Sequence, residues 1–265
     1  MSDWRALEDE LALWRAAGRT AELWWRDDDA ADAGPEFDRL LAIHRETATP
    51  LALAIVPAGA TQALAERLAG EPGVDLLQHG YAHVNHAPPS EKKAELGLHR
   101  PAMIVLGELG TGWLALERLF GDRPLSVMVP PWNRIAPALV PTLPEIGFTG
   151  LSTFGARARA QPVRGLRQIN THVDLIDWKG GRGFAGEEAV LSSLVRALAQ
   201  ARTGGGEPVG LLSHHLAMDG GAWDFLRSLW ERATILPGLS IRPARELFVA
   251  EEFPARSLAE GEAHG

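Results

Sequence analysis

Two groups of carboxylates and imidazoles in this 265-residue sequence have the residue types and spacing of a metal site. Asp27, Asp28 and Asp29 follow a short apolar segment, and three adjacent carboxylates repel one another unless a cation or hydrogen-bond donors hold them. His79 and His83 lie four residues apart, a spacing at which two imidazoles can reach one metal ion. Two histidines and one carboxylate form an open coordination set that leaves a place for water, which is typical of catalytic metal sites.

Three further segments carry polar or aromatic groups directly after apolar runs: Pro130-Pro131-Trp132-Asn133, Asp174-Leu175-Ile176-Asp177-Trp178 and Ser213-His214-His215. Taken singly, each has a simple structural explanation, such as a turn or a helix cap. All five groups follow predicted strands, however, and the carboxyl ends of parallel strands meet at one end of a barrel. The sequence therefore predicts a single site assembled from five strands.

The elements that must position these groups are short apolar runs that alternate with helical patterns, which indicates parallel strands joined by crossover helices. The expected strands are 23–26, 51–56, 74–78, 126–129, 148–152, 173–176, 209–213 and 239–242. The expected helices are 3–17, 35–46, 61–69, 102–120, 137–146, 187–201 and 223–233. We predict one α/β domain over residues 1–253, a distorted (β/α) barrel of seven or eight parallel strands, followed by a flexible tail at 254–265.

Composition excludes several other classes of function. The formal net charge of −8 argues against a nucleic-acid or anionic-membrane partner. Cysteine is absent, so the chain has no disulfide, no thiolate metal site and no cysteine nucleophile. The first residues are acidic where a secretory peptide would be basic, and no apolar run reaches the ~18 residues of a membrane span. We expect a soluble, cytoplasmic protein.

In chain order, five motifs resemble those of the NodB-type polysaccharide deacetylases, carbohydrate esterase family four: Asp28-Asp29, His79…His83, Pro130-Pro131-Trp132, Asp174-x-x-Asp177-Trp178 and Leu212-Ser213-His214. The similarity runs from about Trp24 to Asp219, which is most of the chain. It implies a metal-dependent hydrolase that removes an acetyl or other acyl group from an N-acetylated sugar or related small molecule, with a metal-activated water as nucleophile.

Carried over residue by residue, the resemblance implies a divalent metal ion, zinc in this family, with the ligands Asp29, His79 and His83. It implies that Asp28 is the general base and that His214 is the general acid, with Asp174 or Asp177 tuning that acid. It also implies contacts with a small-molecule or oligosaccharide substrate from Trp132, Asn133, Trp178 and Tyr81.

The motifs leave several assignments open. The family's third motif contains an Arg that pairs with the base, and here Arg26, Arg100 or Arg134 would have to replace it. The acidic pair could be Asp27-Asp28 or Asp28-Asp29. We prefer Asp28-Asp29, because Arg26 then has the Arg-x-Asp-Asp spacing of a divergent branch of the family. Alternation along a strand end turns the Asp27 side chain away from that of Asp28, so Asp27 should matter least.

Three residues next to the proposed ligands and acid also have predicted roles, and two alternative functions remain open. His215 competes with His214 as the acid; otherwise we expect Asn85, His86 and His215 at the rim of the site or orienting its imidazoles. The alternative functions are a metal-dependent amidohydrolase or esterase acting on a non-carbohydrate substrate, and a non-catalytic sugar- or metal-binding barrel. Metal analysis and an assay for acetate release would separate them.

Overall fold

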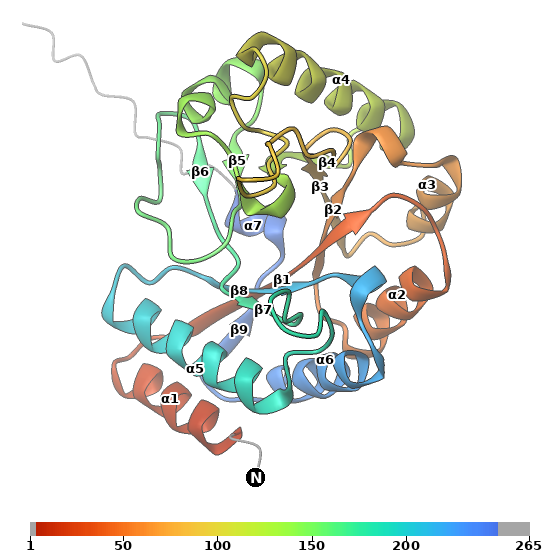
Figure 1. Cartoon of the computed structure of the whole chain (residues 1–265). Helices are drawn as coiled ribbons and strands as arrows, with labels where there is room; N and C mark the ends of the chain where they lie inside the picture. Colours follow the sequence, from red (N-terminus) through yellow and green to blue (C-terminus); the bar gives the residue numbers. More distant parts are fainter. Residues whose placement is uncertain (1–3, 249–265) are drawn as a thin grey trace, which may run out of the picture.

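A single sheet of nine strands forms the centre of the protein in a computed structural model that describes residues 4–248 (Figure 1). The strands are β1 (Ala21–Ala30), β2 (Leu51–Ile55), β3 (Val74–His79), β4 (Pro124–Val129), β5 (Gly150–Leu151), β6 (Arg167–Gln168), β7 (Val173–Asp174), β8 (Val209–Ser213) and β9 (Leu239–Ile241). Eight of them follow the order β6-β5-β4-β3-β2-β1-β8-β7, and β9 pairs with the start of β1. Every named pair is parallel.

The two ends of this order belong to one continuous segment, which closes the sheet. Its first part, β6, pairs with β5, and its last part, β7, pairs with β8. Between them the Thr171 amide donates to the carbonyl oxygen of Thr153 at 3.0 Å, and the His172 amide donates to that of Gly210 at 2.7 Å. The predicted single-domain, distorted (β/α) barrel of seven or eight parallel strands is therefore confirmed.

Among the described residues, six helices surround the strands on the outside of the barrel, and a short seventh (Ala244–Leu247) lies against its inner core (Figure 1). They are α1 (Trp4–Ala16), α2 (Pro35–Thr47), α3 (Gln62–Leu68), α4 (Ala102–Phe120), α5 (Glu187–Thr203), α6 (Gly220–Ala233) and α7 (Ala244–Leu247). Six of the seven predicted helices are confirmed. The bounds of α4 agree at both ends, and those of α1, α2, α3, α5 and α6 agree within about three residues. None of the helices within residues 4–248 is both long and apolar enough to cross a membrane.

The predicted helix 137–146 is wrong: the segment forms two short 3-10 helices, η3 (Pro137–Thr142) and η4 (Pro144–Ile146). Pro141 and Pro144 have no amide hydrogen to donate, so an α-helical ladder cannot run through them. The two-residue strand β6 and the short helix α7 were not predicted. Residues 249–253 of the predicted domain and the predicted tail 254–265 lie outside the described residues.

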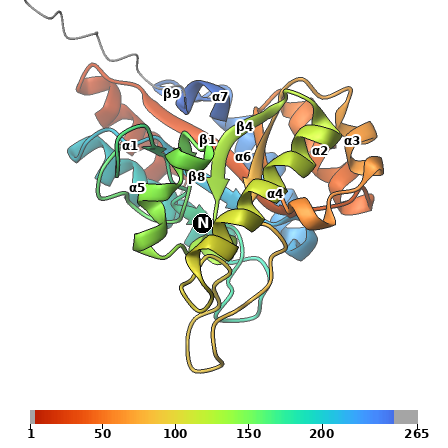
Figure 2. The same cartoon turned by 90° about the horizontal axis from the view of Figure 1, so that it is seen from above.

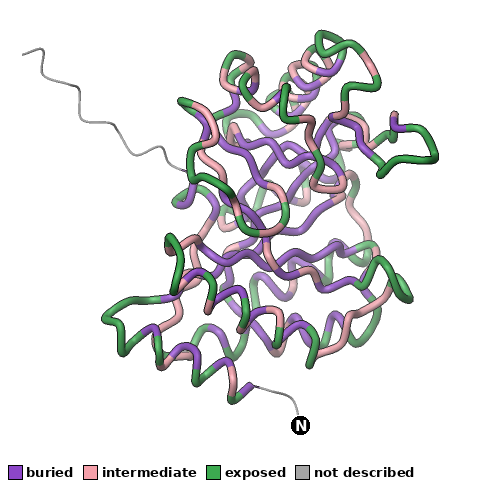
Figure 3. Tube along the Cα trace, turned by 60° about the vertical axis from the view of Figure 1, so that its left-hand side comes forward, coloured by how far each residue is buried: buried purple, intermediate pink, exposed green. Residues whose placement is uncertain are grey.

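Alternation along β1 separates two layers of core. Trp24 packs inside the barrel with Ala52, Val127 and Ile169, and α7 lies against this inner cluster. Trp25 points outward to the helical layer, where its ring lies 5.5 Å from that of Trp230 on α6. Because both faces of the sheet are covered, most residues of the strands are buried, whereas those of β6 and β9 are half-buried (Figure 3).

Since all the strands are parallel, their carboxyl ends open at the same end of the barrel. Figure 2 shows that the connection after β3, in yellow, projects from the end toward which the arrowhead of β4 points. The connections at this end carry the groups that the sequence analysis selected.

Candidate active site

A β-bulge at the end of β1 determines where the acidic residues point. Asp27 pairs with Leu53 and Ala30 with Ile55, so Asp28 and Asp29 together oppose the single residue between those two partners on β2. Asp29 has a φ of 72°, a left-handed conformation that breaks the alternation of the strand. Without the bulge its side chain would follow Asp27 toward the helices; with it, Asp29 faces the barrel opening beside Asp28.

Asp29 meets the two predicted histidines there. Its Oδ1 lies 3.1 Å from Nε2 of His79, at the end of β3, and 3.2 Å from Nε2 of His83, on the loop after β3. One ligand atom from each of the three residues lies within 4.8 Å of the others. Within residues 4–248, this is the one group of three or more His, Asp or Glu side chains close enough to share a metal ion. The structure thus brings together the three residues predicted to bind metal.

The geometry and tautomers of this group fit a zinc-sized ion. Donors at 2.0–2.1 Å from a tetrahedral ion lie about 3.3 Å apart, close to the two Asp29–histidine distances. His79 Nδ1 lies 3.0 Å from the carbonyl oxygen of Val129, which can only accept, so Nδ1 carries a proton and Nε2 is the nitrogen that would face the ion. One carboxylate and two imidazoles are a donor set that zinc prefers.

The pKa values in this group follow from burial and mutual charge. Burial alone would raise the pKa of the Asp29 carboxyl, but the His79 hydrogen bond and the nearby histidine charges outweigh it and hold that pKa below its usual range. Burial lowers the pKa of His83 despite the charge of Asp29. Burial lowers the pKa of His79, but the charges of Asp28 and Asp29 and the hydrogen bond to Asp29 outweigh it and raise that pKa. A metal ion would therefore find Asp29 ionised and His83 neutral, and would have to displace a proton from His79.

Asp28 is paired with an arginine from its own strand. Arg26 is fully buried, and its guanidinium donates to both oxygens of Asp28, from Nε at 2.8 Å and from Nη2 at 3.0 Å. Of the three arginines that the sequence analysis considered, Arg26 is therefore the one that pairs with Asp28. Arg100 instead pairs with Glu108, and Arg134 donates to a backbone carbonyl oxygen.

The remaining donors of Arg26 hold two other strand ends in place. Nη1 donates to the Ser152 hydroxyl at 2.6 Å, and Nη2 donates to Oδ1 of Asn133 at 2.6 Å. Asn133 was predicted to contact substrate; in the structure its side-chain oxygen is occupied by Arg26. This network ties the ends of β1, β4 and β5 together around the Asp28 carboxylate.

The predicted acid, His214, follows β8 and lies beside the second carboxylate cluster. Its Nδ1 is buried without a hydrogen-bond partner, 3.7 Å from Oδ1 of Asp174. The other oxygen of Asp174 accepts a hydrogen bond of 2.8 Å from Nε1 of Trp178, whose ring packs edge-on against His214 at 4.8 Å. Burial raises the pKa of Asp174 more than the charge of His214 lowers it.

The structure separates the two candidates for tuning His214. Asp174 lies next to that imidazole, whereas Asp177 caps its own turn: Oδ1 accepts from the amides of Lys179 at 3.1 Å and Gly180 at 2.9 Å. Only Asp174 is thus placed to act on His214.

The predicted substrate contacts differ in position. The Trp132 ring lies 4.3 Å from that of His83, so Trp132 and Trp178 flank the two imidazoles His83 and His214. Tyr81 lies on the loop between His79 and His83 and is half-buried, and its amide donates to Glu95.

Glu95 is a site residue that the sequence analysis missed. The residue is 1% exposed, and its carboxylate accepts hydrogen bonds from the amides of Tyr81 at 3.1 Å and Ala82 at 2.8 Å. These bonds hold the loop that carries His83, whose φ of 55° is left-handed. No local pattern distinguishes Glu95 from Glu91 on the same connection, so only the tertiary structure reveals it.

The left-handed residues are concentrated at this site. Of the six non-glycine residues with positive φ among those described, four lie here: Asp29, His83, Trp132 and Asn133. Such conformations cost of order 1–3 kcal/mol each and persist where the surrounding structure enforces them, often at functional sites.

The three other neighbouring residues have distinct places. Asn85 organises its own loop, accepting from the amides of Ala87 and Ala94. His86 does not belong to the candidate metal-ligand group of Asp29, His79 and His83. His215 points away from His214 and binds Asp27.

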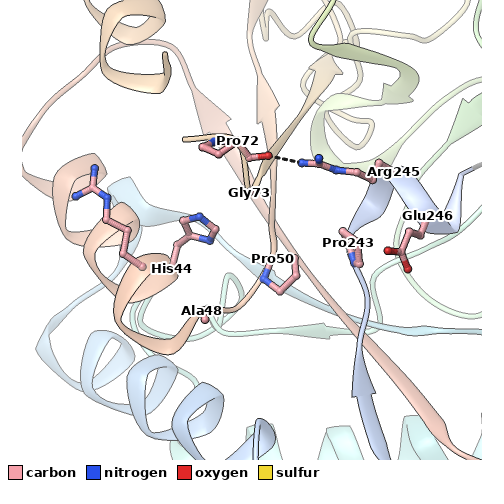
Figure 4. Close-up of a pocket in the computed structure, with 9 residues that line it drawn as sticks. His44, Ala48, Pro50, Pro72, Gly73, Pro243, Arg245 and Glu246 are labelled. Atoms are coloured by element: carbon pink, nitrogen blue, oxygen red, sulfur yellow. Dashed lines mark hydrogen bonds between the residues drawn. The ribbon is translucent and has the colours of Figure 1, made fainter. Parts of the chain in front are cut away.

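A hollow of about 530 Å³ lies at the opposite end of the barrel, between the end of α2 and α7 (Figure 4). Its charged groups are already engaged: Arg45 pairs with Glu71, Arg245 pairs with Asp75, and His44 hydrogen-bonds the carbonyl oxygen of Thr49. The hollow brings together no catalytic set of side chains, so the candidate site is the one at the carboxyl ends of the strands.

No protein-family model and no curated protein sequence matches this chain. Solved structures do match. A Mycobacterium smegmatis protein provisionally assigned as a polysaccharide deacetylase is 18% identical with a TM-score of 0.67, over 87% of this chain and 90% of that one. The Bc1960 peptidoglycan N-acetylglucosamine deacetylase, bound to a naphthalenyl N-oxidanyl-benzamide, is 16% identical with a TM-score of 0.56, over 86% and 88% of the two chains.

A family 4 carbohydrate esterase from Streptomyces lividans, in complex with acetate, is 15% identical with a TM-score of 0.55, over 83% of this chain and 91% of that one. The chain therefore has the fold of the polysaccharide deacetylases, which confirms the fold that the five motifs implied.

Proposed function

We propose that this protein is a metal-dependent hydrolase of the carbohydrate esterase family four type, which removes an acetyl group from an N-acetylated sugar or related small molecule. One observation carries the proposal: Asp29, His79 and His83 converge as a ligand set at the barrel end where an Arg-paired carboxylate and a carboxylate-flanked histidine also lie. The fold shared with the deacetylases supports it.

Asp29, His79 and His83 would hold the metal ion, which we propose is Zn²⁺. When bound, such an ion polarises a carbonyl group and makes water acidic enough to ionise near neutral pH. Asp28 accepts the proton from the attacking water, because the bulge places its carboxylate beside that of Asp29. The forked bonds from Arg26 fix the orientation of that carboxylate.

His214 donates a proton to the departing amine, and the adjacent Asp174 stabilises the charged imidazole. The rings of Trp132 and Trp178 form two sides of the space in which the acyl group binds. The side-chain oxygen of Asn133 accepts from Arg26 and so helps to hold that guanidinium in place.

The test is metal content and turnover on the same preparations. We expect about one zinc per chain, acetate release from N-acetylated sugars, and loss of both after treatment with a chelator, with recovery when Zn²⁺ is restored. His79→Ala and His83→Ala should lose the metal, whereas the matched variant His86→Ala should keep it. Retained metal without turnover on any acetylated sugar, amide or ester would favour the non-catalytic barrel. Turnover of non-sugar amides alone would favour the amidohydrolase alternative.

A further inference from the structure

Asp27 and His215 form a buried ion pair that the proposed chemistry does not use. Both side chains are almost fully buried, and His215 Nδ1 lies 2.5 Å from Oδ1 of Asp27. The other oxygen of Asp27 accepts from the Ser213 hydroxyl at 2.6 Å and from the amide of His215 at 3.1 Å. One carboxylate therefore binds two side chains and one backbone amide at the end of β8.

This pair connects the two strands that carry the proposed base and acid. Asp27 lies on β1 immediately before Asp28, and it is in register with Ser213 on β8, immediately before His214. A further bond reinforces the connection, because Nε1 of Trp25 donates to the Ser213 hydroxyl at 2.8 Å.

Asp27 and His215 lie behind the site rather than in it. His214 has an extended backbone (φ −139°, ψ 90°), so its side chain and that of His215 point to opposite sides. The His215 ring packs against Phe37 of α2, with centroids 5.9 Å apart, while His214 packs against Trp178. Nδ1 of His214 makes no hydrogen bond, so that nitrogen does not hold the ring in place.

We propose that Asp27 and His215 are positioning residues that fix His214 relative to Asp28. The inference rests on the proposed function, in which His214 is the general acid. The Asp27 carboxylate adds to the β1–β8 ladder the contacts that hold Ser213 and His215, the residues on either side of His214, so its loss lets the His214 backbone move relative to the base. A misplacement of about 1 Å can cost about 10²-fold in rate.

The variants that test this are Asp27→Asn and His215→Leu, with two controls. Both oxygens of Asp27 accept hydrogen bonds from Ser213 or His215, so the NH₂ group of Asp27→Asn would face at least one of those donors. His215→Asn retains a donor near the position of Nδ1 and should restore most of what His215→Leu loses. Asp32→Asn is the matched acidic control, since Asp32 binds the Thr61 hydroxyl outside this cluster.

The first readout is the leaving-group dependence of turnover by zinc-loaded protein. Asp27→Asn and His215→Leu should lower kcat for an N-acetyl amide by about 10²-fold, as expected for a misplaced acid. Hydrolysis of 4-nitrophenyl acetate, whose leaving group needs no proton, should be unchanged, and so should metal content. His214→Ala should show the same selectivity, and adding Asp27→Asn to it should cause little further loss. Equal losses on both substrates, or an unchanged amide rate, would overturn the proposal.

The second readout does not depend on turnover. In the metal-free protein, imidazole NMR signals of His214 should shift in Asp27→Asn and His215→Leu but not in Asp32→Asn or His215→Asn. Unchanged His214 signals in the first two variants would overturn the positioning role. A wild-type protein inactive on amides and esters would refute the proposed function instead, and the NMR comparison would still decide the placement of His214.

Discussion

The guanidinium of Arg26 and the carboxylate of Asp28 form a two-bond fork within a single strand, with Nε to Oδ1 at 2.8 Å and Nη2 to Oδ2 at 3.0 Å. Residues two apart on a strand face the same side, so the bulge that follows Asp27 does not disturb this pair. The carboxylate proposed as base is thereby held by a cation that cannot move independently of it.

Arg26→Met should be strongly destabilising. It would leave the Asp28 carboxylate buried without its cation, which typically costs about 3–5 kcal/mol. Urea unfolding of the metal-free protein measures the change in the free energy of unfolding. Arg134→Met is the control: Arg134 is exposed and donates only to the Lys93 carbonyl oxygen, so its loss should matter little. Similar stabilities for the two variants would contradict the role given to Arg26.

Asp28→Asn and Asp29→Asn should separate the base from the ligand. Asp28→Asn cannot accept a proton, so we expect bound metal to be retained while turnover falls on the order of 10²–10⁴-fold. Asp29→Asn removes the ligand charge and should release the metal. Metal analysis and acetate release on both variants check this. The register Asp27-Asp28 would be correct if Asp29→Asn kept metal and rate while Asp28→Asn lost the metal.

Glu95→Gln should weaken metal binding without any contact to the metal. A glutamine offers one acceptor where the loop amides of Tyr81 and Ala82 need two, so the His83 loop loses a restraint. Changes to groups that orient ligands typically cost about 10–100-fold in metal affinity. Competition with a zinc chelator measures that affinity. Glu91→Gln, on the same connection but exposed and paired with His99, should leave it unchanged.

Gly210→Ala should disrupt the closure of the barrel. A Cβ there would lie 2.7 Å from Cα of Thr171 and 2.8 Å from the carbonyl oxygen of Asn170, which are backbone atoms that cannot rotate away. Gly107→Ala, in the middle of α4 with nothing within 4 Å, should stabilise the protein by about 0.5–1 kcal/mol. Thermal unfolding of the two variants should show changes of opposite sign.

The contribution of His215 to stability should depend on pH. Burial alone lowers the pKa of His215, but the charge and hydrogen bond of Asp27 outweigh it and raise that pKa, and Asp29 and Glu36 add to the effect. The folded protein therefore holds this proton more tightly than the unfolded chain. The stabilisation is fully present below the unfolded pKa of about 6.5 and is lost as pH rises through the folded pKa.

The measurement is the difference in unfolding free energy between metal-free wild type and His215→Leu. That difference should be larger near pH 5.5 than near pH 9. A constant difference, or one that grows with pH, would show that His215 does not carry the proton in the folded state.

Much of the fold could be predicted because its elements are long enough to show a pattern. The bounds of α4 and the positions of β2, β3 and β8 follow from apolar runs and their flanking residues. The strand β6 could not be predicted, because two residues show no periodicity. Its place depends on the pairing of its segment with β5 on one side and, through β7, with β8 on the other.

The site was less predictable than its motifs suggest. Alternation indicates that the side chains of Asp27 and Asp28 diverge, but only the bulge brings Asp29 back beside Asp28. Arg26 could not be selected from three arginines, since a fully buried arginine inside a strand is recognisable only from its partners. Glu95 and the Asp27–His215 pair depend on contacts between distant segments, which spacing in the sequence does not encode.

The pairing of β1 with β8 also has a consequence for biosynthesis. Asp27 and Ser213 are paired across 186 residues, so the site cannot assemble until most of the chain has been translated. At roughly 5–20 residues per second, β1 waits on the order of 10–40 s for β8 to leave the ribosome. During that interval one edge of β1, with its two tryptophans, has no strand beside it, and such edges promote aggregation. Production of this protein should therefore depend on how the nascent chain is protected while its last third is made.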